Sequence, residues 1–131
     1  MLNVKLQYLC SLNQEILRLE KIKAQMQKNR DYEKRDEFYK DLNWCKEERK
    51  KIIKENPLKD VELTEEEKVM ASFYYYEGKT WELAFDEMVS QLELTIYDKY
   101  SDDELIRCVN RLRKYIVRKI EKYNNYYKKV K

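Results

Sequence analysis

The sequence contains no histidine, one glycine and one proline among its 131 residues. Histidine is the commonest general base and the commonest zinc ligand, so its absence removes most familiar catalytic and metal sites. Dinucleotide-binding and phosphate-binding loops each need at least two glycines, and Gly78 stands alone. The common nucleotide-binding enzymes are therefore excluded. We find no catalytic constellation, and we predict a protein that is not an enzyme and holds neither a cofactor nor a metal.

The three cysteines, Cys10, Cys45 and Cys108, are too far apart in the sequence to form a C-x-x-C pair. An odd number of scattered cysteines is typical of a reducing compartment rather than of a secreted disulfide scaffold. Long apolar runs are also missing: residues 1–12 alternate apolar with polar side chains, and no segment approaches the ~20 apolar residues of a membrane span. We therefore expect a cytoplasmic protein with neither a signal peptide nor a membrane segment.

Charged residues, by contrast, make up 40% of the chain. Ala, Glu, Lys, Leu and Arg together account for 62 residues, a share that is typical of long helices. With glycine and proline almost absent, the composition predicts an all-α protein and makes an all-β fold untenable. The length suits one domain, or a small domain with an elongated appendage, and allows a core that is stable without disulfides.

The net charge of +3 conceals a strong segregation of charge along the chain. Residues 1–56 carry a net charge of +4, residues 57–106 carry −10, and residues 107–131 carry +9. A basic C-terminal segment indicates a surface for nucleic acid or another acidic partner, although charge runs are also found on helix faces that are merely solvated. The charge balance alone leaves both interpretations open.

Residues 1–56 have the pattern of two amphipathic helices, separated by the polar stretch 28–31. Their apolar positions recur every three or four residues. The first series, which Lys23 interrupts, contains Leu2, Leu9, Leu12, Ile16, Leu19 and Met26, and the second contains Phe38, Leu42, Cys45 and Ile52. Asn56-Pro57 ends the second helix, because the residue before proline is pushed out of the helical region. The two helices either fold back as an antiparallel hairpin or pair with another subunit, so residues 2–55 are a candidate homodimerisation element.

Residues 57–131 contain clear signals for helix starts and stops. The segments 64–67 and 101–104 are capping boxes, in which a hydroxyl and a carboxylate bond each other's backbone N–H groups. Gly78 suits the left-handed conformation that closes a helix from residue 65 to about residue 77, and Thr80 caps the short helix that follows. Helix, glycine turn and helix form the outline of a helix-turn-helix, although an αα-corner in any small bundle has the same outline.

The final helix, predicted from residue 102 to about Tyr127, is the most informative feature of the sequence. Its apolar residues gather on one side and are Leu105, Val109, Leu112, Ile116, Ile120 and Tyr123. Five basic residues form a narrow stripe on the opposite side, which we call the basic stripe: Arg107, Arg111, Lys114, Arg118 and Lys122. Any amphipathic helix turns its charges outward. Ten basic residues against one acidic residue in 107–131 nevertheless favour a polyanion as the partner.

Two tyrosine-rich segments are less specific signals. Tyr74, Tyr75 and Tyr76 are able to stack on exposed bases, but consecutive helical residues point in different directions. We therefore expect core packing for these side chains. The tail from Tyr123 to Lys131 is either a contact for nucleic acid or a partner, or a frayed helix end.

The segment from Leu63 to Met88 resembles phage transcriptional regulators of the ArpU type, whose DNA-binding part is similar to the helix-turn-helix of the fourth sigma-factor region. The characteristic stretch is Tyr75-Tyr76-Glu77-Gly78-Lys79-Thr80-Trp81-Glu82, followed by Ala84 and Met88. The resemblance covers about a fifth of the chain. It implies a helix-turn-helix bundle, preceded by a helical region, that binds duplex DNA. With this resemblance, we predict that DNA contacts the basic stripe, with Lys79 and Thr80 as a second contact surface.

In the family a recognition helix follows directly, usually opening with serine and continuing through basic positions, a pattern that Ser101 to Lys114 shows. Here Val89 to Tyr100 intervene, where a turn of three or four residues is normal. Either this turn is enlarged, or Ser90 to Tyr97 forms the third helix and the basic helix is an addition. The carboxylates at 102–104 also occupy positions from which a recognition helix contacts DNA, and the DNA backbone repels them.

Two functional hypotheses follow. The first is a phage or mobile-element transcriptional regulator, with residues 1–56 as a dimerisation hairpin and residues 57–131 as a bundle that contacts duplex DNA. The second is a protein-binding inhibitor or adaptor, for example a phage anti-defence protein such as an anti-CRISPR, whose partner is a host nucleoprotein complex. In the second hypothesis the acidic middle segment mimics nucleic acid. The length and acidity of residues 89–106 favour the second hypothesis, and the basic stripe favours the first.

Overall fold

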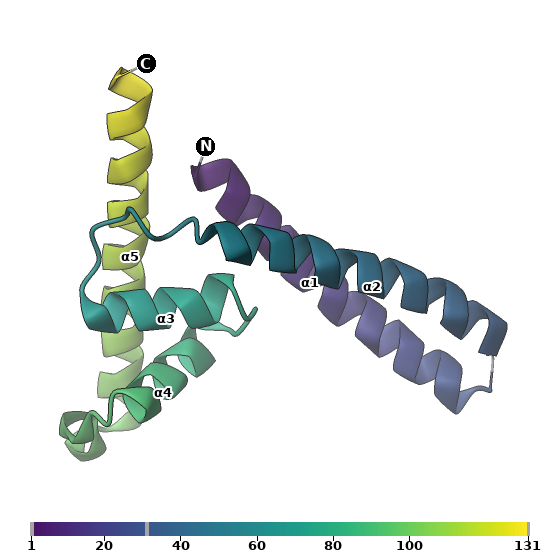
Figure 1. Ribbon diagram of the computed structural model, residues 1–131. Coiled ribbons are helices and arrows are strands. Elements are labelled where there is room, and N and C mark those ends of the chain that lie inside the picture. The colour runs from purple at the N-terminus through teal and green to yellow at the C-terminus, as the bar shows by residue number, and fades with distance from the viewer. Residues whose placement is uncertain (1, 31, 131) are drawn as a thin grey trace. The chain divides into compact units, whose positions relative to one another are not determined.

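The computed structural model describes residues 2–30 and 32–130, and the side chains of residues 2, 3 and 125–130 lie outside this description. Throughout the described residues the regular structure is helical, which confirms the all-α prediction. The elements are α1 (Leu2–Lys28), α2 (Tyr32–Glu55), α3 (Glu65–Tyr75), α4 (Trp81–Gln91), the 3-10 helix η1 (Thr95–Lys99) and α5 (Asp102–Val130) (Figure 1). They form two compact units, one of residues 5–57 and one built on residues 58–131. In the described part, no helix has an apolar stretch of the length that a bilayer requires.

Helices α1 and α2 form an antiparallel hairpin (Figure 1). Three polar pairs show the direction, because the partner's number falls as the residue number on α1 rises. They are Lys5 with Glu55 at 2.7 Å, Asn13 with Arg49 at 3.2 Å, and Glu20 with Lys46 at 3.3 Å. Between the helices lies a cluster of apolar side chains, consisting of Leu12, Ile16, Leu19, Leu42 and Cys45, with Phe38 and Ile52 packed against it. The two apolar series therefore bury each other within one chain, as in the hairpin alternative.

The interruption of the first apolar series has a local explanation. The ammonium group of Lys23 lies 4.5 Å from the centre of the Tyr39 ring on the facing helix. A cation over an aromatic face is attracted by the negative potential of the ring. Lys23 thus remains within the contact between the helices without bringing an unpaired charge into the apolar cluster. Leu2, the first member of the predicted series, has its side chain outside the described residues.

Two residues near predicted helix ends, Gly78 and Asn56, adopt positive φ angles. Gly78 has φ 71°, the predicted left-handed conformation, but α3 already ends at Tyr75 rather than near residue 77, so Gly78 lies within the turn that follows. Helix α2 ends before Pro57 as predicted, but Asn56 adopts φ 49° rather than an extended conformation. Its N–H donates to the carbonyl of Ile53 at 2.9 Å, which satisfies part of the last turn. Asparagine tolerates this region better than most residues, so the helix ends there without glycine.

Helices α3, α4 and α5 form a three-helix bundle in which each helix contacts the other two. Both bonds of the first capping box are present, between Thr64 Oγ1 and the Glu67 N–H at 3.2 Å and between Glu67 Oε1 and the Thr64 N–H at 2.9 Å. The connection between α3 and α4 takes only residues 76–80. The buried apolar residues of this unit include Leu58, Val61, Met70, Ala71, Ala84, Phe85, Met88, Cys108, Val109, Ile116 and Ile120.

The connection between α4 and α5 is an enlarged turn, and the alternative of a third helix over residues 90–97 is wrong. Helix α4 continues to Gln91 and is then broken, because Glu93 adopts the left-handed conformation with φ 53°. The short helix η1 follows, and its Tyr97 ring meets the buried Phe85 ring edge to face at 5.1 Å. The inserted residues are thus anchored on the bundle, and α5 is its third helix.

Candidate nucleic-acid interface

Helix α5 has the two faces that its sequence predicts. Val109, Ile116 and Ile120 are buried in the bundle, and the other three predicted apolar positions are half-buried. Cys108 is buried on the same side, a position that sequence reasoning did not assign to the core. The burial of Cys108 could have been predicted from the sequence. Cys108 precedes Leu112 by four residues, so the two side chains lie on the same side of the helix.

All five side chains of the basic stripe are exposed to solvent. Among the described residues, none of the five forms an ion pair. From Arg107 to Lys122 the stripe extends over about 22 Å at 1.5 Å per residue. The structure therefore places the five predicted cations on one open face of one straight element, where their charge is available to a partner.

Lys119 does not belong to this stripe and has a structural role. Its ammonium group binds Oε1 of Glu67 on α3, and the Glu67 side chain is 3% exposed. The same Oε1 accepts the backbone N–H of Thr64, so the capping box and the ion pair share one oxygen. This contact joins α5 to the start of α3 and helps to hold the rotation of α5 that keeps the basic stripe outward. Sequence reasoning found the cap but missed Lys119.

The Glu67 carboxyl has a pKa below its usual value. Burial alone raises the pKa of a carboxyl group, because it penalises the charged form. Here the hydrogen bonds from Lys119 and Thr64 to the carboxylate outweigh that effect. A carboxyl whose pKa is lower in the folded state stabilises the fold above its unfolded pKa, and this contribution is lost as the pH falls through the folded pKa.

We expect the substitution Lys119→Met to destabilise the protein by about 2 kcal/mol near neutral pH, because it leaves a buried carboxylate without its cation. Methionine retains most of the apolar stem, so the lost charge dominates the effect. The difference between the wild type and the variant should shrink as the pH falls through the folded-state pKa of Glu67, because a protonated carboxyl no longer needs the cation. Urea unfolding followed by circular dichroism at several pH values measures this. A difference that stays constant with pH would contradict the role given to the ion pair.

The first turn of α5 is acidic where a recognition helix usually contacts DNA. Glu104 closes the second capping box, with its N–H donating to Ser101 Oγ at 3.3 Å and its Oε1 accepting the Ser101 N–H at 3.4 Å. Asp102 and Asp103 are exposed beside it, and carboxylates in a first turn are favoured by the helix dipole. These acidic residues therefore stabilise the helix start. The cations of the basic stripe begin at Arg107, beyond this acidic turn.

Lys79 and Thr80 lie on a different element from the basic stripe, in the turn between α3 and α4. Oγ1 of Thr80 accepts the N–H of Leu83 at 3.2 Å and caps α4, as predicted. The N–H of Lys79 donates to the carbonyl of Phe73 at 3.1 Å. The hydroxyl of Thr80 is thus engaged in the fold, and the structure gives both residues a role in the turn.

The neighbouring tyrosines pack within the bundle, as expected from the sequence. The Tyr74 ring stacks on the Trp81 ring with centroids 3.8 Å apart and planes within 9°. The hydroxyl of Tyr76 accepts the N–H of Leu58 at 3.0 Å and joins the start of this unit to α3. One face of Tyr74 is therefore already covered by a protein ring. Of the tail from Tyr123 to Lys131, Tyr123 and Asn124 are half-buried, and the side chains of residues 125–131 lie outside the described residues.

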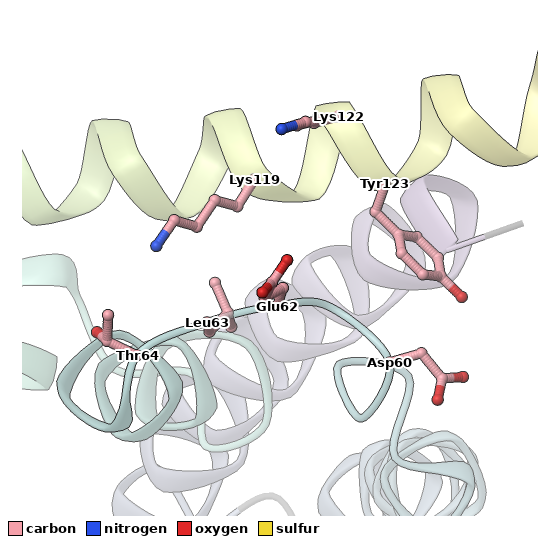
Figure 2. Close-up of a pocket in the computed structure, with 7 residues that line it drawn as sticks. All are labelled: Asp60, Glu62, Leu63, Thr64, Lys119, Lys122 and Tyr123. Carbon is pink, nitrogen blue, oxygen red and sulfur yellow. The ribbon is translucent and has the colours of Figure 1, made fainter.

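A pocket of ≈ 550 Å³ lies between α5 and the segment before α3. It is lined by Asp60, Glu62, Leu63, Thr64, Lys119, Lys122 and Tyr123. Figure 2 shows Lys119 and Tyr123 extending from α5 toward the segment 60–64. Two carboxylates line the pocket, and Lys119 is already paired with Glu67, so the pocket has little net attraction for an anion. Lys122 belongs to the basic stripe and borders this pocket, and the stripe, with its five exposed cations, is the stronger candidate site.

No family model, no curated protein and no solved structure matches this chain. The candidate interface therefore depends on the geometry and the charge of α5.

Proposed function

We propose that the protein binds duplex DNA through the basic stripe of α5 and acts as a phage or mobile-element regulator of transcription. The observation that carries this proposal is the row of five exposed cations on the face of α5 opposite its buried side. Clusters of lysine and arginine along one helix face are the electrostatic footprint of nucleic-acid binding. The resemblance of residues 63–88 to a sigma-type helix-turn-helix agrees with this function.

The dimensions of the stripe suit contacts with the DNA backbone. The major groove is about 12 Å wide, whereas the stripe measures about 22 Å, so its cations are able to reach phosphates on both sides of a groove. Phosphate contacts position a protein on DNA without reading its sequence. Since the acidic first turn of α5 is repelled by phosphates, we propose that backbone contacts from Arg107 to Lys122 supply most of the affinity.

The wild-type protein should bind duplex DNA with a steep dependence on salt. Neutralising five phosphates releases counterions and gives a slope of log affinity against log salt of about −4 to −5. Fluorescence anisotropy with two labelled duplexes of unrelated sequence, measured over a salt series, determines this slope. We expect similar slopes for both duplexes. Absence of binding at low salt would remove the DNA hypothesis.

A protein-binding inhibitor or adaptor is the second candidate function, and it is favoured by the exposed carboxylates of the middle segment. Glu82, Asp86 and Glu87 on α4 and Asp102 and Asp103 on α5 are all exposed. Such a surface suits a partner that ordinarily binds nucleic acid, because carboxylates provide the same sign of charge as phosphates. A host complex that the protein retains in a pull-down after nuclease treatment, without any DNA binding by the protein itself, would favour this function.

A further inference from the structure

The outward face of α4 combines acidic side chains with an exposed leucine. Leu83 is 52% exposed. Asp86 and Glu87 follow it by three and four residues, so they are its neighbours on the helix surface, and Glu82 lies one turn before Asp86. All three carboxylates are exposed. We call Glu82, Leu83, Asp86 and Glu87 the acidic face.

The basic stripe of α5 has the same pattern with the opposite charge. Tyr115 is 45% exposed, although it is a large aromatic residue. Arg111 precedes it by four residues and Arg118 follows it by three, so both flank it on the helix surface. Lys114 and Arg118 are separated by one turn, as are Glu82 and Asp86 on α4. Tyr115, flanked by cations on α5, thus corresponds to Leu83, flanked by carboxylates on α4.

The two faces do not meet within one chain. Helices α4 and α5 contact each other in the bundle core, where Phe85 and Met88 of α4 and Ile116 of α5 are buried. Both charged faces consist of exposed residues. In the described part of the chain, no ion pair joins α4 to α5. Among the described residues, the carboxylates of α4 and the cations of the basic stripe are therefore not paired with each other, and both faces are exposed to another molecule.

We propose that the acidic face of α4 docks on the basic stripe of α5 in a second copy of the chain. Equal spacing lets Glu82 and Asp86 pair with Lys114 and Arg118 across two adjacent helices, as charged flanking positions do in coiled coils. Leu83 and Tyr115 supply apolar contact, which exposed ion pairs need in order to hold two molecules together. In a dimer with a two-fold axis, both faces of each copy would be used at once. This surface differs from the α1–α2 hairpin.

The test is sedimentation of the nuclease-treated full chain, without DNA. The wild type should associate at about 0.05 M salt and dissociate at about 0.5 M, because salt screens exposed charges. Asp86→Lys with Glu87→Lys, and separately Arg111→Glu with Arg118→Glu, should each weaken association by about tenfold or more. Mixing the two variants should restore association, because each then meets the opposite charge. The control is Lys21→Glu with Lys40→Glu on the hairpin. It changes the net charge by the same amount as Arg111→Glu with Arg118→Glu and should leave association unchanged.

Three results would overturn the proposal. They are a wild type that remains monomeric at low salt, association that both charge variants retain, and a mixture of the two variants that fails to associate. Circular dichroism verifies that each variant is folded. If a reversal prevents folding, the neutral pair Asp86→Asn and Glu87→Gln replaces it and should still weaken association. The experiment contains no DNA, so its outcome can be read apart from the proposed DNA binding, with which docking of a second copy would compete for the basic stripe.

Discussion

Reversing Arg111 and Lys114 to glutamate is expected to weaken binding to duplex DNA on the order of 100-fold at about 0.1 M salt. Each substitution removes an attraction to phosphate and introduces a repulsion. Both side chains are exposed on the face of α5 opposite the bundle, so the fold should be retained. Because phosphate contacts do not read sequence, the loss should be the same for unrelated duplexes. Anisotropy titrations of both proteins measure the change.

The matched control for this double variant is the reversal of Lys21 and Lys40 to glutamate, on α1 and α2. It changes the net charge by the same amount, at exposed positions outside the basic stripe. We expect it to retain most of the affinity of the wild type. If Arg111→Glu with Lys114→Glu binds as tightly as this control, the contact surface lies elsewhere, and Lys79, Thr80 and the start of α4 become the next region to test.

The substitution Leu19→Asp is expected to unfold the α1–α2 hairpin. Leu19 is 2% exposed in the apolar cluster, so aspartate there loses the packing of a leucine and buries a charge without a partner. Together these effects cost at least about 4 kcal/mol, which is most of the stability of a small domain. Circular dichroism and limited proteolysis should show loss of helix in residues 5–57.

Leu17→Asp is the control, because it introduces the same side chain two residues away. Leu17 is 55% exposed, so this substitution should change the free energy of unfolding by less than about 1 kcal/mol. Equal effects of the two substitutions would mean that the hairpin is not held by the described cluster. Sedimentation of the wild type at high salt also tests the homodimer that we considered for residues 2–55, because an apolar seam between subunits persists at high salt.

Features that depend on neighbours in the sequence could be predicted. The capping box at Thr64 could be predicted because its second member, Glu67, lies only three positions later. The left-handed conformation of Gly78 could be predicted because glycine has no side chain. The two faces of α5 follow from the helical period, because its burial repeats the spacing of its apolar residues. For the same reason, sequence reasoning placed the five members of the candidate interface on a common face.

Features that depend on distant residues could not be predicted. Lys119 and Glu67 are separated by 52 positions, and nothing near either residue identifies the other as its partner. Tyr97 anchors the long connection through its contact with Phe85 on α4, and the spacing of the two residues does not identify them as partners. The apolar series at Leu12 and Leu19 fits an intrachain hairpin and an intersubunit seam equally well, because both bury the same side chains. The helical period predicts which residues share a face, but it does not predict whether that face binds phosphate groups or is only solvated.

The central claim is that the basic stripe of α5 contacts DNA phosphates, and the salt dependence of binding tests it most directly. For a duplex titrated with the wild type and with Arg111→Glu, Lys114→Glu, the quantity to compare is the slope of log affinity against log salt. Two lost phosphate contacts should make the slope shallower by about two units. A double variant that binds with the slope of the wild type would contradict the claim.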